Sequence, residues 1–385
     1  MSSTDPAPPE QGENLKPEAP RPGQPTELKL RFDGTASEYF RIWVVNLCLT
    51  LATLGIFSAW AKVRKKRYFY SHTVLDGTPF QYLGQPLPIL KGRLVAVVLF
   101  AIYYAASHFF TSLLPVVIAA GLVIAPWAIA RSAAFTARYS AYRNMTFSFT
   151  GDYRGTLRAT YWLGLIPIIA TGIAFQTSEV VAGGTAAIVF GIAFAVFGIL
   201  FPWWLARFKK FLMSSTAFGG VSADMNITGG QLWSIYFRGG LLIAAGGVVV
   251  GGTGAVLVGV SHMPSYLAGA LGLASFYVGY VLGYAYIKAA STNLVWSNTT
   301  LGPLRFVSTL RGRGLAWLYL SNAIAIVASL ALLTPWAVVR TLKYRADHMQ
   351  VVLDGELTAF SGSDTSSVQA AGAEVSEVFD LDLSL

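Results

Sequence analysis

The chain has 385 residues, of which 54% are hydrophobic and 12% are charged, whereas soluble domains carry about twice that charged fraction. This composition excludes an ordinary water-soluble globular protein and a disordered protein, and it indicates a membrane protein with several spans. The single cysteine, Cys48, excludes a disulfide framework. The formal charge of the whole chain is +9, but residues 29–360 hold 26 bases and 9 acids and so have a net charge of +17.

The first 28 residues differ in composition from the rest of the chain. They contain seven of the seventeen prolines and no aromatic residue, and a segment of this kind cannot bury enough apolar surface to fold. We therefore expect residues 1–28 to form a disordered proline-rich arm, followed by a membrane domain over residues 29–360.

The first apolar run, residues 42–61, has bases at both of its ends. Arg41 precedes the run, and a dense basic cluster follows it from Lys62 to Arg67. Basic residues mark the cytoplasmic side of a span, but a run of this length is too short to cross the bilayer twice. We favour a re-entrant helix pair with a break at the Thr-Leu-Gly sequence of residues 53–55; the alternative is a single crossing.

Three helical hairpins are predicted next, over residues 94–130, 157–206 and 235–288. Each contains two apolar runs, and ~20 residues of helix cross the hydrocarbon core of a bilayer. The connections at residues 108–112, 176–185 and 261–266 contain no lysine or arginine. The positive-inside rule therefore places these connections outside and the basic segments in the cytoplasm.

The last apolar run, residues 315–339, also has bases at both ends, and the same re-entrant interpretation applies to it. Single crossings by the first and last runs would instead give eight spans and place both termini outside. Beyond residue 360 the chain carries five acids and no base. Residues 361–385 are therefore expected to form an acidic disordered tail.

Four apolar runs end in the same pattern: a tryptophan, a base four residues later, and an aromatic residue four residues after that. This spacing places the three side chains on one face of a helix. The pattern predicts an internal repeat of about five units, with the tryptophan ring at headgroup depth and the base reaching the phosphates. The implied partner is the lipid bilayer, with anionic phospholipid headgroups near the basic cluster. The sets are Trp60, Arg64 and Tyr68; Trp127, Arg131 and Phe135; Trp203, Arg207 and Phe211; Trp336, Arg340 and Tyr344; and a weaker fifth set of Tyr284 and Lys288.

Short β-prone segments follow these helices. Asp76-Gly77 and Asp354-Gly355 each stand between two such segments, and Asp-Gly is a strong signal for the turn of a β-hairpin. The predicted fold is an all-α polytopic membrane bundle built from helical hairpins. Small cytoplasmic β-hairpins lie between these helical hairpins and could join into one sheet on the inner face.

Residues 32–77 carry the motifs that allow comparison with a known family. Phe-Asp-Gly at 32–34, Leu-Gly-Ile-Phe-Ser-Ala-Trp-Ala-Lys-Val-Arg at 54–64 and Arg-Tyr-Phe-Tyr-Ser-His-Thr at 67–73 resemble the YjgN-like family of bacterial inner-membrane proteins. The resemblance extends over residues 29–360, and a weaker version of the same motif lies at residues 335–355. It implies a multi-pass protein of the bacterial inner membrane, and it implies no catalytic residue because the family has no established activity.

No pattern in the sequence indicates catalysis. The four histidines, at positions 72, 108, 262 and 348, show no metal-binding spacing, and the sequence contains neither a serine-nucleophile elbow nor a phosphate-binding loop. We therefore expect no enzyme activity, catalytic residue, cofactor, metal or nucleic-acid partner. The expected function is transporter-like or lipid-binding; the alternative is a scaffold or assembly factor that docks a cytoplasmic protein partner through its β-hairpin layer.

Overall fold

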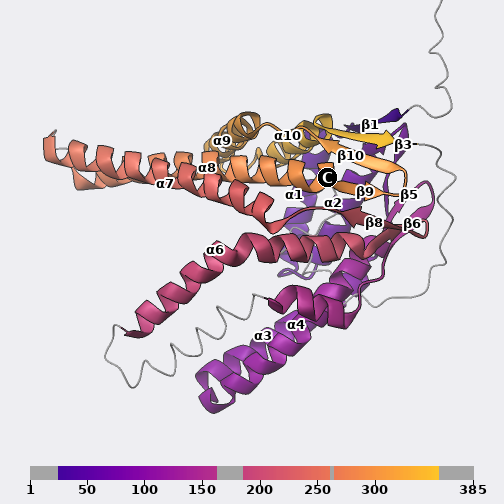
Figure 1. The fold of residues 1–385 in the computed structure, drawn as a ribbon, viewed down its shortest axis with the longest axis horizontal. Helices are drawn as coiled ribbons and strands as arrows, with labels where there is room; N and C mark the ends of the chain where they lie inside the picture. Colours follow the sequence, from indigo (N-terminus) through magenta and orange to yellow (C-terminus); the bar gives the residue numbers. More distant parts are fainter. Residues whose placement is uncertain (1–24, 163–184, 261–263, 355–385) are drawn as a thin grey trace, which may run out of the picture.

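A computed structural model of the chain describes residues 25–162, 185–260 and 264–354. Short strands alternate with pairs of helices, and the helices project away from a single sheet (Figure 1). The helices are α1 (Ala36–Ala52), α2 (Ser58–His72), α3 (Pro86–His108), α4 (Leu114–Arg138), α6 (Thr185–Ser214), α7 (Gly229–Val260), α8 (Ser265–Ser297), α9 (Gly312–Ala328) and α10 (Thr334–Asp347), and residues 153–162 are also helical. The strands are β1 (Thr26–Phe32), β2 (Thr73–Leu75), β3 (Thr78–Pro79), β4 (Gln81–Tyr82), β5 (Ser140–Tyr142), β6 (Met145–Phe149), β7 (Thr216–Phe218), β8 (Val221–Met225), β9 (Thr299–Leu301), β10 (Leu304–Ser308) and β11 (Met349–Leu353).

The eleven strands of the described residues belong to one sheet, in the order β3-β2-β1-β11-β10-β9-β8-β7-β6-β5-β4. The two edge strands, β3 and β4, are separated in sequence by Phe80 alone, so the sheet curls almost into a closed barrel. The antiparallel pairing of β1 with β11 joins the two ends of the described chain, with Leu28 opposite Val351.

The prediction of an all-α polytopic bundle with small β-hairpins is therefore wrong. A hairpin with strands this short is at best marginally stable alone. Pairing the hairpins edge to edge satisfies the backbone groups that each would otherwise leave exposed. The predicted domain boundary also shifts, because β1 begins at Thr26, inside the range assigned to the disordered arm. Residues 1–24 and the predicted tail at 361–385 lie outside the described residues.

The chain passes through the sheet in five similar steps. In each step a strand leads into helices, and the strand that follows the helices pairs antiparallel with the first. Each helix pair therefore starts and ends at the sheet and projects from its same side (Figure 1). One backbone hydrogen bond of 2.8–3.0 Å closes every step: Asp33 N to His72 O, Leu83 N to Tyr139 O, Thr150 N to Ser215 O, Asn226 N to Asn298 O and Thr309 N to His348 O.

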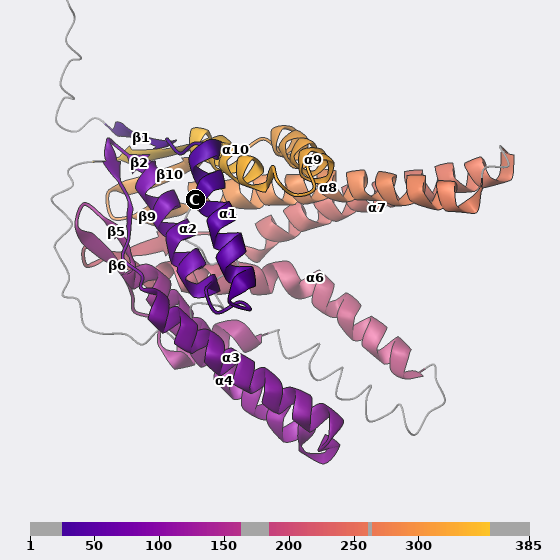
Figure 2. The ribbon, with the colours of Figure 1, turned by 180° about the vertical axis from the view of Figure 1, so that it is seen from behind.

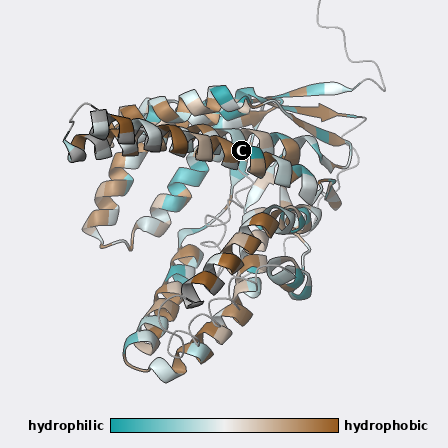
Figure 3. Cartoon of the chain, turned by 60° about the vertical axis from the view of Figure 1, so that its left-hand side comes forward, coloured by the Kyte–Doolittle hydropathy of each residue, from teal (hydrophilic) through white to brown (hydrophobic). Residues whose placement is uncertain are grey.

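Five helical segments are long and apolar enough to cross a membrane, among the residues that the structure describes: 86–108, 111–138, 191–214, 229–249 and 269–297. They belong to the three predicted helical hairpins. Hydrophobic residues recur along the projecting helices (Figure 3), and many of their large apolar side chains are exposed. The first crossing of the predicted hairpin over residues 157–206 falls mainly on residues outside the described ranges.

The first and last apolar runs each form two helices joined by a tight turn. α1 ends at Ala52 and α2 begins at Ser58, and the chain turns with a φ of +49° at Leu54. The turn between α9 and α10 has a φ of +48° at Leu330. Each of these runs is therefore two short helices and not one continuous helix, with the first break at the predicted Thr-Leu-Gly sequence. α1 packs against α10, so the two short pairs lie side by side (Figure 2).

Candidate ligand-binding cavity

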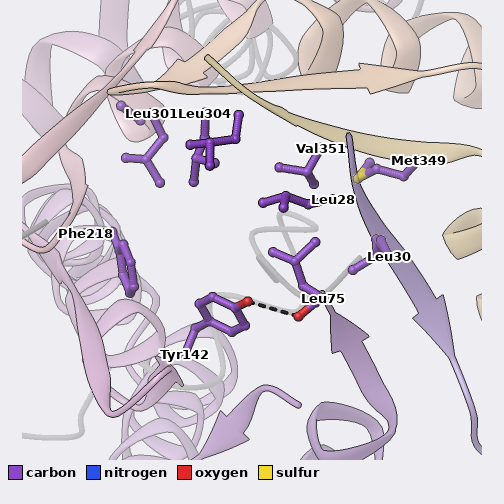
Figure 4. Packing of buried hydrophobic residues seen from close by; sticks show 11 residues of the cluster. Leu28, Leu30, Leu75, Tyr142, Phe218, Leu301, Leu304, Met349 and Val351 are labelled. Carbon is purple, nitrogen blue, oxygen red and sulfur yellow. Dashed lines mark hydrogen bonds between the residues drawn. The ribbon is translucent and has the colours of Figure 1, made fainter. Parts of the chain in front are cut away.

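An apolar cavity of about 210 Å³ lies inside the curled sheet. Successive side chains of a strand face opposite sides, and in β1 Leu28 and Leu30 are buried whereas Lys29 and Arg31 are exposed. Figure 4 shows inward side chains around a common space. The buried residues of this core come from eight strands and are Leu28, Leu30, Leu75, Tyr142, Phe218, Ala223, Leu301, Leu304, Met349, Val351 and Leu353.

One end of the cavity meets the helices. Thr73, Ser140, Thr216 and Thr299 line it, and each is the first residue of a strand that follows a helix. Each of their hydroxyls donates to the carbonyl oxygen four residues earlier, at distances of 2.7–2.9 Å. Because these hydroxyls already have acceptors, the wall of the cavity presents mainly carbon to a ligand.

Tyr142 and Arg143 supply polar groups at the hairpin end of the cavity. The Tyr142 hydroxyl donates to the Leu75 carbonyl oxygen at 2.9 Å, and burial raises the pKa of this phenol, so it remains a donor at neutral pH. Arg143 is the only charged residue among the described residues that line the cavity. Its guanidinium lies 3.0 Å from the Asp76 carboxylate and 5.5 Å from the centre of the Tyr142 ring.

Arg143 occupies a backbone conformation that arginine rarely adopts. It has a φ of +48°, and Asn144 has a φ of +62°, in the two-residue turn that joins β5 to β6. Such turns favour Asn, Asp and Gly, and a left-handed conformation costs another residue roughly 1–2 kcal/mol. An arginine in this conformation beside the cavity is a candidate for contacting the polar end of a ligand.

We expect Tyr142→Phe to reduce the free energy of unfolding by about 1 kcal/mol, because it removes a hydrogen bond and leaves the Leu75 carbonyl without that donor. Thermal unfolding in detergent measures the effect. Tyr103→Phe, which changes an exposed phenol on α3, is the control and should leave the midpoint unchanged. Equal thermal unfolding midpoints for the two variants would contradict a stabilising hydrogen bond from Tyr142 to the Leu75 carbonyl.

The predicted tryptophan and arginine positions lie outside this cavity, along the second helix of four pairs. Each tryptophan lies 13 residues before the following strand (60 to 73, 127 to 140, 203 to 216 and 336 to 349) and each arginine lies nine residues before it. A helix rises 1.5 Å per residue, so each tryptophan lies about 20 Å along its helix from the strand that follows. We call this distance from the strands the tryptophan level. The structure places them at equivalent positions along four helices and does not bring them into one pocket. Lys288 lies eleven residues before β9 (288 to 299) and does not share the arginine position.

Three of the four arginines lie near a tryptophan ring. Arg131 is 5.9 Å from the centre of Trp127, and Arg340 is 5.1 Å from that of Trp336. Arg207 lies 4.6 Å from Trp162, on a neighbouring helix. The fourth, Arg64, is exposed. A cation over an aromatic ring is attracted by the electron-rich face of the ring.

The aromatic residues in the third position of the pattern pack close to the sheet. The Tyr68 hydroxyl accepts the Thr35 N–H at 2.9 Å, and burial raises its pKa. The Tyr344 hydroxyl donates to the Arg311 carbonyl oxygen at 3.3 Å. These tyrosines therefore fix the loop that leads into their own helix pair. Phe135 is buried and Phe211 is half-buried.

The predicted Asp-Gly turns lie at the rim of the sheet. Asp76 and Gly77 join β2 to β3, with φ values of +48° and +72°. Asp354 follows β11 and forms an ion pair with Arg305. Gly355 lies outside the described residues.

Two of the histidines occupy matching places at the ends of α2 and α10. The Nδ1 atom of His72 lies 2.7 Å from the Tyr68 carbonyl oxygen, and that of His348 lies 2.8 Å from the Tyr344 carbonyl oxygen. Within the described residues, no group of three or more His, Cys, Asp or Glu side chains is placed to hold a metal ion. The helix carbonyls account for the positions of both rings.

The cavity leaves little signal in the amino-acid sequence. Its clearest signal is the alternation of Leu28, Leu30 and Phe32 in β1, and the boundary drawn at residue 28 divided this pattern. Most of the other lining strands have three to five residues, too few for a period of two to stand out.

Comparison with known proteins places the chain among bacterial membrane proteins. A family model described as "Bacterial protein of unknown function (DUF898)" matches residues 27–378. The chain is 22% identical over 356 residues to the inner membrane protein YjgN of Salmonella typhimurium, covering 84% of this chain and 88% of that protein. It is 29% identical over 197 residues to the inner membrane protein YjgN of Escherichia coli O157:H7 and 29% identical over 202 residues to that of Escherichia coli K12. Each match covers 49% of this chain and 50% of the relative, so the chain matches about half the length of these two relatives. No solved structure matches the chain.

Proposed function

The chain belongs to the DUF898 family of bacterial proteins of unknown function, and from this premise we propose that it is an inner-membrane protein that binds a lipidic molecule inside its sheet. The apolar cavity of about 210 Å³ carries the proposal. An engineered apolar cavity of about 150 Å³ stays dry and binds benzene. A cavity of this size and chemistry can therefore take up a segment of an alkyl chain.

The polar end of the ligand would lie near Arg143. The guanidinium can contact an anionic or hydrogen-bond-accepting headgroup while the chain occupies the apolar space. The proposed role is binding without catalysis. The described lining residues include no cysteine, histidine or carboxylate that could act as nucleophile or base in the cavity.

We further propose that the sheet lies on the cytoplasmic side and that the tryptophan level marks the headgroups of that leaflet. The exposed members of the basic cluster, Arg64, Lys65 and Arg67, would then attract anionic phospholipids, at about 1 kcal/mol per base near the surface. The other two bases, Lys62 and Lys66, are buried. The five similar strand–helix–strand steps support the proposal that the chain is built from repeated units. Repetition would explain why the four tryptophans stand at equal distances from their strands.

We expect Ala223→Phe to prevent ligand binding, because Ala223 lines the cavity and a phenyl ring would fill it. Ser222→Phe is the control, since Ser222 is exposed on the opposite face of the same strand. Mass spectrometry of lipids bound to protein purified in nanodiscs should show at least tenfold less lipid in Ala223→Phe than in the control. The unfolding temperature should not fall, because the ring occupies empty space.

Equal bound lipid in the two variants, or none in the wild type, would contradict the lipid-binding proposal. If the wild type carries no lipid and a soluble protein can be crosslinked to the outer face of the sheet, the scaffold role replaces it.

A further inference from the structure

The two short helix pairs end much closer to the sheet than the other helices. α1 and α9 have 17 residues each, whereas α3 has 23 and α7 has 32. Within the described chain, none of α1, α2, α9 and α10 is long and apolar enough to span a membrane. α2 begins two residues before Trp60 and α10 begins two residues before Trp336. The turns therefore reach only about 10 Å beyond the tryptophan level, at 1.5 Å per residue.

The tips of both pairs are apolar and exposed. Leu54 has 96% of its surface exposed and Leu330 has 89%. Residues 43–60 and 315–339 contain no charged side chain. Single exposed leucines are common on soluble proteins, but these tips form contiguous apolar patches. The neighbouring exposed residues are Leu51 and Ile56 on the first tip, and Val327 and Leu332 on the second.

Both tips satisfy the polar groups of their turns internally and in the same way. The Thr53 hydroxyl accepts the Phe57 N–H at 2.9 Å, and the Ser329 hydroxyl accepts the Leu333 N–H at 3.0 Å. The amides of Gly55 and Ala331 each donate at 2.8 Å to the carbonyl oxygen five residues earlier. Water would satisfy these groups in an exposed turn, but non-helical backbone in lipid must find its partners within the protein.

The leucines at the tips also stand where turn chemistry favours other residues. Leu54 and Leu330 have φ values of +49° and +48°, a conformation in which asparagine and glycine are favoured. In water, a leucine here is both strained and exposed. Contact with acyl chains offsets the strain, because the side chain then leaves water.

We propose that these two tips, residues 51–57 and 327–333, insert into the acyl chains of the leaflet nearest the sheet and do not cross the membrane. Trp60 and Trp336 then lie at headgroup depth, as the base of each tip. Because α1 packs against α10, the two tips form one apolar wedge in that leaflet. The wedge involves neither the sheet cavity nor its ligand. A negative result for lipid binding in the cavity would therefore leave the insertion proposal unaffected, and the reverse is also true.

Cysteine labelling tests the insertion. On a Cys48→Ser background, which removes the only native thiol, a charged impermeant maleimide is applied to everted vesicles and to spheroplasts. Ser222→Cys reports the sheet side and Phe109→Cys, at the far end of α3, reports the opposite side. We expect Leu54→Cys and Leu330→Cys to react more than tenfold more slowly than these controls from both sides, and to react fully in detergent. Labelling of the tips at the Ser222→Cys rate, or from the Phe109→Cys side, overturns the proposal.

Asparagine substitutions at the tips give a second test, because the expected change in unfolding temperature has opposite signs for tips in lipid and tips in water. Asparagine relieves the strain at a positive φ but places an amide among acyl chains. We therefore expect the double variant Leu54→Asn, Leu330→Asn to lower the unfolding temperature in nanodiscs. A rise in that temperature would mean that the tips are in water and would overturn the proposal.

Discussion

Replacing Gly246 by leucine is expected to separate α7 from α8 and to reduce the folded yield to near zero. A Cβ atom at Gly246 would lie 2.7 Å from the Cα atom of Gly279. Because that contact is to backbone, the neighbour cannot move aside as a flexible side chain can. Small residues allow membrane helices to approach this closely, and overpacking by a branched side chain here should cost at least about 3 kcal/mol.

Gly247→Leu is the matched control for this prediction. A Cβ atom at Gly247 meets nothing within 4 Å, so this variant adds the same side chain one residue away without a clash. Size-exclusion profiles of tagged protein in detergent, followed by thermal unfolding, measure both variants. If Gly246→Leu and Gly247→Leu gave the same monodisperse peak and midpoint, the close contact between α7 and α8 would be refuted.

The contact between these helices continues for another turn. A Cβ atom at Gly283 would lie 2.8 Å from the carbonyl oxygen of Gly239. Of the many glycines in α7 and α8, a specific subset therefore lies at the interface, namely Gly239, Gly246, Gly279 and Gly283. Gly247 and Gly252, which meet nothing within 4 Å, do not belong to this subset.

The second large effect is expected from Asn322→Leu. Asn322 is buried, and its Oδ1 atom accepts from Arg340 at 3.0 Å while its Nδ2 atom donates to the Thr341 hydroxyl at 3.1 Å. Leucine would remove an acceptor from a half-buried guanidinium and leave the Thr341 hydroxyl without this donor. We expect a loss of about 2–3 kcal/mol in the free energy of unfolding.

Asn46→Leu provides the control at the matching place in the first helix pair. Asn46 donates to the Ala61 carbonyl oxygen at 3.4 Å, as Asn322 does to Ala337 at 3.3 Å. However, the Oδ1 atom of Asn46 is buried without a hydrogen-bond partner, so leucine removes an unsatisfied atom. We expect a change within about 0.5 kcal/mol, measured by thermal unfolding in nanodiscs. An equal loss of unfolding free energy in both variants would show that the hydrogen bond from Arg340 to Asn322 does not contribute to stability.

The two asparagines illustrate the limit of what a pattern can predict. The spacing from Asn46 to Trp60 and Arg64 equals that from Asn322 to Trp336 and Arg340. The guanidinium nevertheless binds the asparagine in one pair, whereas Arg64 is exposed in the other. Equal spacing fixes which helix face a residue occupies, but the rotamer depends on the surrounding side chains.

The amino-acid sequence by itself determined the features that depend on local composition. Uncharged apolar runs predict helices long enough for a bilayer, and Leu54 lies where the first run breaks into α1 and α2. These features follow from backbone hydrogen bonding within a segment and from the exclusion of charge from lipid. Relatives named inner membrane proteins agree with them.

Only the tertiary structure decided that the β segments form one curled sheet around a cavity. Leu28 meets Val351 across β1 and β11, and no local pattern links residues so far apart in the chain. Strands of two to seven residues gain little stability alone, so their pairing depends on helix pairs returning each strand to the same edge. The cavity exists because this closure places side chains of eight strands around one space.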